Sequence, residues 1–82
     1  MSFAYRRDIL DALWRHGVQP THETDPELVR NFVRELYKYE IRLLRKRYMH
    51  GDFPKGEYWT RVDALRRRYQ VLATPSRLWL ER

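Results

Sequence analysis

The sequence contains no cysteine, which excludes disulfides and any metal site built on thiolate ligands. It has only three glycines, at positions 17, 51 and 56, and these are too isolated to form a phosphate-binding loop. It also has no apolar run long enough to span a membrane, and MSFAYRRDIL carries charges where a secretory signal is apolar. We therefore expect a soluble, cytoplasmic protein with no membrane partner.

Catalytic groups are equally scarce. The histidines His16, His22 and His50 have no spacing that would place two ligands on one helical face. No spacing brings a serine or threonine together with one of these histidines as a nucleophile and its base. A chain of 82 residues also has little room for a closed pocket. We expect no catalytic residues, metal, cofactor or small-molecule substrate, and hence no enzyme.

Helical periodicity is what the sequence does contain. The pattern predicts helices over about residues 3–16, 25–50 and 54–71, and a short tail helix over about 75–81. Gly17 and Gly51 are expected to end the first two helices, and either Thr24 with Glu27 or Asp25 with Pro26 begins the second. The spacing of Phe53 and Tyr58 is typical of a hydrophobic staple before the third.

The long second segment carries two apolar lines at helical spacing. In the first line, three apolar residues recur every seven positions and two aromatic residues fall between them. The second line runs beside the first at helical spacing. Their members are Val29, Phe32, Leu36, Tyr39 and Leu43 in the first, and Val33, Tyr37, Ile41, Leu44 and Tyr48 in the second. A stripe this wide is expected to contact two neighbours.

The third segment carries a narrower seam, suited to packing antiparallel on the second; its members are Tyr58, Val62, Leu65, Tyr69 and Leu72. We therefore predict one all-α domain over residues 1–82. Its architecture is a long antiparallel helical hairpin with a packed N-terminal helix and a short C-terminal helical tail. Such a small chain needs tight, aromatic-rich helix packing, or burial against another copy or a partner.

The stretch MHGDFPKGEYWTRVDALRRRY resembles the SHOCT family of short helical hairpin domains. The residues that match the family pattern include Gly51, Phe53, Glu57, Tyr58, Arg61 and Leu65, with Leu44 upstream. The resemblance covers about residues 43–70 and implies an oligomerisation or docking role. Pro54, Gly56 and Arg47 depart from the pattern.

Positive charge forms two clusters, Arg45–Lys46–Arg47 and Arg66–Arg67–Arg68, in a chain of net charge +6. Such clusters, interleaved with aromatic residues, could bind the phosphates of a nucleic acid. In an antiparallel hairpin, however, the clusters lie about 15 Å apart along the axis, and carboxylates such as Glu35 and Glu40 can face them. A solvated face is the alternative interpretation.

Large apolar side chains near the turn and in the tail are candidates for a protein interface: Trp59, Leu78, Trp79 and Leu80. Trp59 packs either on the first helix, against Trp14, or on a partner. The tail either folds back over the hairpin with Trp79 as a plug or docks into another chain. We therefore expect a non-catalytic interaction or assembly module that binds itself or a larger partner, with nucleic-acid binding through the arginine clusters as the alternative.

Overall fold

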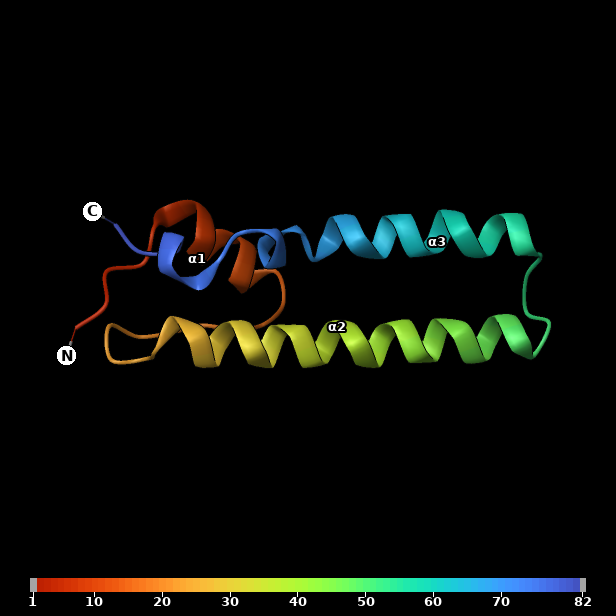
Figure 1. Ribbon diagram of the computed structural model, residues 1–82, viewed down its shortest axis with the longest axis horizontal. Helices are drawn as coiled ribbons and strands as arrows, with labels where there is room; N and C mark the ends of the chain where they lie inside the picture. The colour runs from red at the N-terminus through yellow and green to blue at the C-terminus, as the bar shows by residue number, and fades with distance from the viewer. Residues whose placement is uncertain (1, 82) are drawn as a thin grey trace.

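The computed structural model describes residues 2–81, and over this range the chain is all-α, as predicted (Figure 1). Three α-helices come first: α1 (Arg7–Trp14), α2 (Pro26–Met49) and α3 (Lys55–Arg68). Two short 3₁₀ helices follow: η1 (Gln70–Ala73) and η2 (Ser76–Leu78). The molecule is elongated, with extents of 49 × 18 × 16 Å.

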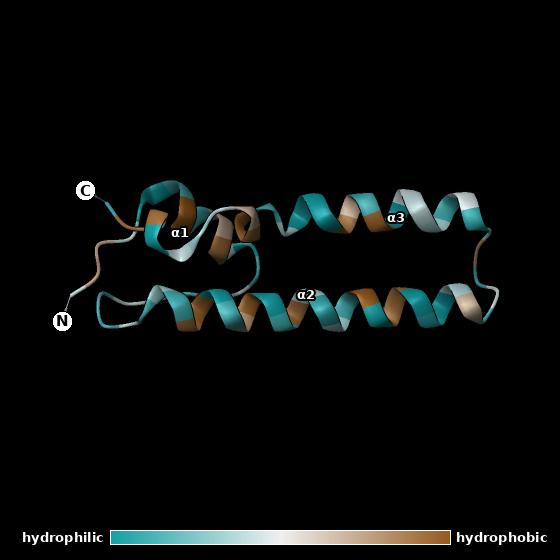
Figure 2. Ribbon diagram, viewed as in Figure 1, coloured by the Kyte–Doolittle hydropathy of each residue, from teal (hydrophilic) through white to brown (hydrophobic). Residues whose placement is uncertain are grey.

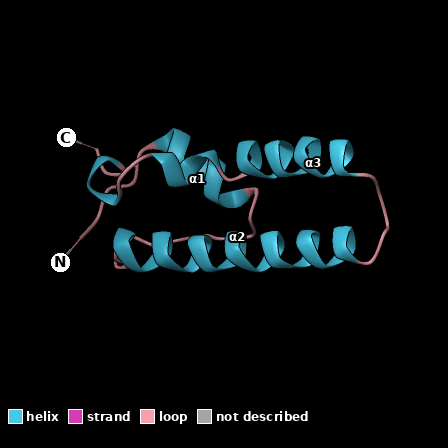
Figure 3. Ribbon diagram, turned by 45° about the vertical axis from the view of Figure 1, so that its right-hand side comes forward, coloured by secondary structure: helices cyan, strands magenta, loops and turns pink. Residues whose placement is uncertain are grey.

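The elements form two unequal layers (Figures 1 and 3). The α2 helix makes up one layer alone, and α3 runs alongside it in the opposite direction after the turn that follows Met49. The two 3₁₀ helices also contact α2, and α1 packs on η1 at the end away from the turn. One side of α2 is therefore covered along most of its length by the rest of the chain.

Local signals set both ends of α2. The Asp25 side chain accepts a hydrogen bond of 2.9 Å from the backbone N–H of Glu27, and Pro26 occupies the first helical position. Of the two predicted starts, the one with the Asp25 cap is therefore correct. At the other end Gly51 adopts φ +85°, and the N–H of Asp52 donates to the carbonyl of Arg47 at 3.0 Å. This left-handed cap is the one that glycine favours.

The ends of the chain differ from the prediction because they pair with each other. The expected helix over 3–16 is shorter, since Tyr5 forms an isolated antiparallel bridge with Leu80 and holds the start of the chain extended. The N–H of Arg6 donates to the carbonyl of Trp79 at 2.8 Å. The tail over 75–81 is consequently a 3₁₀ turn followed by this bridge, not an α-helix.

The core draws on every layer of the molecule. Its buried apolar side chains are Tyr5, Ile9, Leu13, Val29, Val33, Leu44, Phe53, Val62, Leu65, Tyr69, Val71 and Trp79. Apolar segments recur along α2 between hydrophilic ones in Figure 2, as expected for a helix with a covered side. Phe53 and Tyr58 stack at 6.4 Å between ring centroids, where the sequence predicts a staple. The turn is thus packed by its own aromatic rings.

Candidate interaction surface

The two apolar lines of α2 have different surroundings. In the second line Val33 is 0% exposed and Leu44 9%, while Tyr37, Ile41 and Tyr48 are half-buried against the core. In the first line Val29 is buried and Leu36 half-buried, but Phe32, Tyr39 and Leu43 are exposed by 55%, 58% and 42%. The second line is therefore core, whereas most of the first line faces outward.

Two further apolar side chains extend this exposed set. Leu28 and Met49 stand near opposite ends of α2 and are 67% and 74% exposed. Because each residue turns an α-helix by about 100°, all five side chains fall within about a third of its circumference. We call Leu28, Phe32, Tyr39, Leu43 and Met49 the outer line. The neighbours of α2 within residues 2–81 are α3, η1 and η2, and they leave the outer line exposed.

The outer line also includes charged positions. Glu35 and Arg42 lie seven residues apart, on the same part of the helix as the five apolar side chains. Glu35 forms an exposed ion pair of 3.4 Å with Lys38. No carboxylate of residues 2–81 lies within 4.0 Å of the Arg42 guanidinium. Lys46, exposed and on the same part of the helix, adds a second positive charge, so one negative and two positive side chains stand among the five apolar ones.

Trp59 forms a separate exposed site. Its ring is 60% exposed and lies edge-on to Tyr58, with centroids 5.3 Å apart. Trp59 lies in the first turns of α3, which begins after the turn, whereas α1 packs at the other end of the molecule (Figure 1). Of the two alternatives for Trp59, the contact with Trp14 is therefore wrong. Trp14 is itself 62% exposed. Trp59 therefore remains available to a partner.

The tail residues divide into core and surface. Trp79 is 0% exposed, and its indole N–H donates to the carbonyl of Thr74 at 3.0 Å. Of the two alternatives for the tail, the one that folds back with Trp79 as a plug is therefore correct, and Trp79 is not an interface residue. Leu80 is half-buried and bridged to Tyr5, and Leu78 is 37% exposed. Of the tail candidates, only Leu78 retains an exposed side chain.

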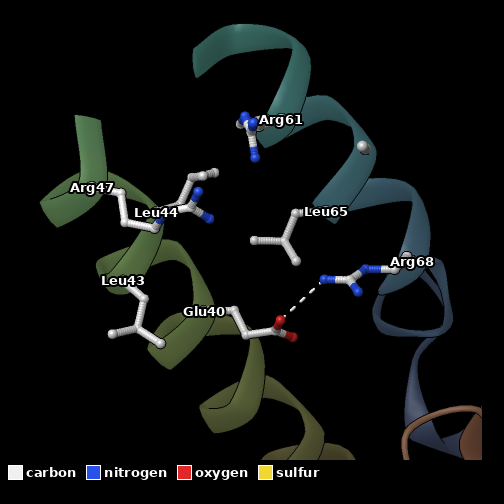
Figure 4. A pocket seen from close by; sticks show the side chains of 8 residues that line it. Glu40, Leu43, Leu44, Arg47, Arg61, Leu65 and Arg68 are labelled. Atoms are coloured by element: carbon white, nitrogen blue, oxygen red, sulfur yellow. Dashed lines mark hydrogen bonds and ion pairs between the residues drawn. The ribbon is translucent and has the colours of Figure 1, made fainter. Parts of the chain in front are cut away.

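A shallow groove of about 320 Å³ lies between α2 and α3, next to the outer line (Figure 4). Its apolar lining comes from Leu43, Leu44, Ala64 and Leu65. Its polar lining comes from Glu40, Arg47, Arg61 and Arg68. The groove thus collects one arginine from each sequence cluster, although the clusters were expected to lie apart along the hairpin. Arg61 and Glu40 are the members that the sequence did not single out as site residues.

The arginines of the groove are already paired. Arg68 contacts Glu40 at 3.0 Å, as drawn in Figure 4, which realises one of the cross-hairpin pairs expected from the sequence. The others pair locally, Arg47 with Asp52 at 3.5 Å and Arg61 with Glu57 at 2.7 Å. The Arg61 guanidinium also lies 4.6 Å from the centre of the Phe53 ring. Carboxylates therefore offset the positive charge of this groove.

One tyrosine ties the groove to α1. The Tyr69 hydroxyl donates to Glu40, and its ring stacks on His16 with centroids 4.2 Å apart. The His16 Nε2 lies 2.9 Å from the carbonyl oxygen of Arg68. Burial, followed by the hydrogen bond and the negative charge of Glu40, raises the pKa of Tyr69 to about 12. These contacts hold the segment that follows α1 against the hairpin. They also engage the carboxylate of Glu40, which lines the groove.

The remaining basic candidates do not gather on one surface. Arg45 and Lys46 line a shallow depression with Arg42, Met49 and His50 on α2. Arg66 lines another with Tyr37 and Gln70. Arg67 is paired with Asp63 at 3.6 Å. The two predicted clusters are thus divided among the groove and two separate depressions.

Residues 2–81 contain no group of three or more histidine, aspartate or glutamate side chains that could hold a metal ion. No helix of the described chain is both long and apolar enough to cross a bilayer.

Comparison with protein-family models, with curated proteins and with solved structures finds no match to the chain. The resemblance to the SHOCT family therefore stays a prediction from the sequence.

Proposed function

We propose that the protein is a small non-catalytic interaction or assembly module, which docks through the outer line of α2 and uses Trp59 as a second, separate anchor. The observation that carries the proposal is the outer line itself. Five large apolar side chains, 42% to 74% exposed, follow one side of a 24-residue helix. Scattered apolar residues are normal on a surface, whereas five large ones gathered along one side of a helix are typical of a docking site.

The polar groups of the chain also support a binding role. The groove beside the outer line has its three arginines paired with carboxylates. Tyr69, which donates to the groove's Glu40, has its pKa raised by burial and by that carboxylate and stays protonated at neutral pH. A groove whose charged groups already bind each other can frame an interface, but it offers no unpaired nucleophile or base for chemistry.

Nucleic-acid binding is the alternative, and one observation favours it. Arg42, Arg45 and Lys46 lie together on α2 with no carboxylate of residues 2–81 within 4.0 Å of any of them. Phosphate binding there would depend steeply on salt, because each neutralised phosphate releases counterions. An apolar interface would survive the same increase in salt.

A photo-crosslinking amino acid placed in the full chain tests the proposal in cells that express it. Position 39 probes the outer line and position 59 the turn, and position 63, also exposed and on α3, is the matched control. We expect protein adducts from position 39, weaker ones from position 59, and none from position 63. Equal adducts at all three positions, or none at positions 39 and 59, would contradict the proposal.

Fluorescence anisotropy with duplex DNA and single-stranded RNA tests the alternative. We expect weak binding at about 50 mM salt that disappears at about 200 mM. Sub-micromolar affinity at the higher salt would replace the proposed function with nucleic-acid binding and direct mutagenesis to Arg42, Arg45 and Lys46.

A further inference from the structure

We infer that the occupant of the outer line is a second copy of this chain, whose α2 packs antiparallel on the first about a two-fold axis near residue 38. The inference rests on the proposed function and goes further by naming the partner and its register. It is argued from the order of apolar and charged side chains along α2. A two-fold dimer brings the same patch of both copies together, so that patch must complement itself.

The outer line does complement itself when it is reversed. With the axis near residue 38, positions whose numbers add to about 76 face each other. Leu28 then faces the partner's Met49, so the two most exposed apolar side chains of the helix cover each other. Phe32 likewise faces the partner's Leu43. The axis lies at the middle of Pro26–Met49, so the two helices overlap along their whole length.

Charge selects this register from its neighbours. In the proposed register Glu35 faces the partner's Arg42, and symmetry forms this pair twice. A shift of seven residues in one direction places Glu35 against the partner's Glu35, and a shift in the other places Arg42 against the partner's Arg42. A like-charge contact opposes association, whereas the opposite pair fixes register. Arg42 has no carboxylate within 4.0 Å in residues 2–81, so it is available for such a pair.

Charge also opposes the parallel arrangement. Parallel helices in register bring like-numbered residues close together across the interface. Glu35 then faces the partner's Glu35, and Arg42 faces the partner's Arg42. The antiparallel arrangement is therefore favoured by its apolar contacts and by its two pairs of Glu35 with the partner's Arg42, which outweigh the approach of the two Lys38 side chains near the axis.

The exposed area is of the size that a small dimer needs. A large apolar side chain buries about 200 Å² when it is fully covered. The five members of the outer line are 42% to 74% exposed, so together they offer on the order of 600 Å² per copy. A standard interface buries about 800 Å² per partner. Glu35, Arg42, Lys46 and the helix backbone between them contribute the remainder.

A charge-swap experiment on the full chain tests the register. Sedimentation equilibrium should show wild-type protein passing from 10.2 kDa to twice that mass as its concentration rises. Glu35→Arg and Arg42→Glu each place like charges opposite each other twice, and each should raise the dimer dissociation constant about tenfold or more. The double variant Glu35→Arg/Arg42→Glu restores both pairs and should return the constant to within about threefold of wild type.

Controls separate loss of the interface from loss of the fold. All substituted positions are exposed, and circular dichroism should show unchanged helix content in each variant. Lys55→Glu reverses an exposed charge at the start of α3, outside the outer line, and should leave the dissociation constant unchanged. A chain that stays at 10.2 kDa up to about 1 mM, or a double variant as weak as the single ones, overturns the inference.

Spin labels test the direction of the helices, and the absence of native cysteine allows a single label at His50→Cys. Antiparallel packing puts the two labels about 40 Å apart, because they lie about 25 residues apart along the shared axis. A separation below about 20 Å would indicate a parallel dimer and overturn the inference. Adducts to another protein from position 39, with no dimer, would overturn the inference and leave the proposed function standing.

Discussion

Two apolar lines run along α2 with opposite fates: the second line, called the inner line from here on, is core, and the outer line is exposed. Val33 and Leu44 are buried because the chain returns and places its other elements against that side. Phe32 and Tyr39, on the neighbouring line, are more than half exposed because residues 2–81 place too little there to cover them. Periodicity thus shows which side chains share a face, whereas the length and course of the remaining chain decide which face is covered.

Trp79 and Trp59 make the same comparison with one residue type. Trp79 is fully buried and its indole N–H is bonded, whereas Trp59 is 60% exposed. Burial of a large aromatic side chain contributes several kcal/mol in the best cases, so the two positions should respond very differently to truncation. The predictions below use such matched pairs.

The largest effect is expected for Trp79→Ala. The change opens a cavity in the core and removes one of the two donors to the carbonyl of Thr74, leaving the longer bond of 3.3 Å from Arg30. A core tryptophan truncated to alanine costs about 3–5 kcal/mol, which is comparable with the whole stability of a small domain. Circular dichroism at 25 °C should show most of the helix lost. Trp59→Ala, the control, should melt within a few degrees of wild type.

Leu44→Ala should have the next largest effect. Leu44 is 9% exposed and packs in the inner line, so its truncation should lower the free energy of unfolding by about 2–4 kcal/mol in urea titrations. Its neighbour Leu43 is 42% exposed, and Leu43→Ala at low protein concentration should cost less than about 1 kcal/mol. Equal losses of stability for the two variants would show that the inner and outer lines do not differ in what they contribute to the fold.

Alkaline pH should lower the free energy of unfolding through the two buried tyrosines, Tyr5 and Tyr69. Burial, with the negative charge of Asp25, raises the pKa of Tyr5 from 10.0 to about 12. Burial and Glu40 do the same for Tyr69. Both tyrosines are therefore held neutral in the folded chain, and the stability they contribute is complete below about pH 10 and falls as the pH rises towards 12.

Urea unfolding at pH values from 9 to about 12 measures this loss. The variant Tyr5→Phe/Tyr69→Phe cannot ionise at these positions, so its stability should decline less over the same range. A variant that loses stability as steeply as the wild type would show that these two hydroxyl groups do not cause the alkaline transition.

The smallest effect is expected on the charged surface. Glu57→Gln removes the exposed pair with Arg61 but leaves the Arg61 guanidinium over the Phe53 ring. Exposed pairs of this kind contribute about 0.3–0.5 kcal/mol, so the melting temperature should fall by no more than a few degrees. A loss comparable to that of Leu44→Ala would mean that the groove depends on its ion pairs rather than on its apolar lining.

The sequence predicted those features that local chemistry decides. The all-α class, the start of α2 at Asp25 and Pro26, and its end at Gly51 all follow from residues within a few positions of each other. The prediction was wrong where distant segments meet. The bridge between Tyr5 and Leu80 shortens the first helix and prevents an α-helical tail, and no local signal announces it.

The candidate site was predicted in part for the same reason. Its apolar lines were visible in the sequence, but the exposed one could be identified only once α3, η1 and η2 had a place. Trp79 was offered as an interface residue, although the fold buries it. Arg61 enters the groove although the sequence marked it only as a match to the family pattern, and its carboxylate partner is Glu57, four residues before it.

Two-dimensional ¹H–¹⁵N spectra recorded across a dilution series test the central claim most directly. If the outer line is the surface that a second copy covers, resonances of Phe32, Glu35, Tyr39 and Arg42 should move with concentration. The indole N–H signals of Trp59 and Trp79 should stay fixed. Shifts confined to the Trp59 indole, or none on α2 at any concentration, would contradict the account.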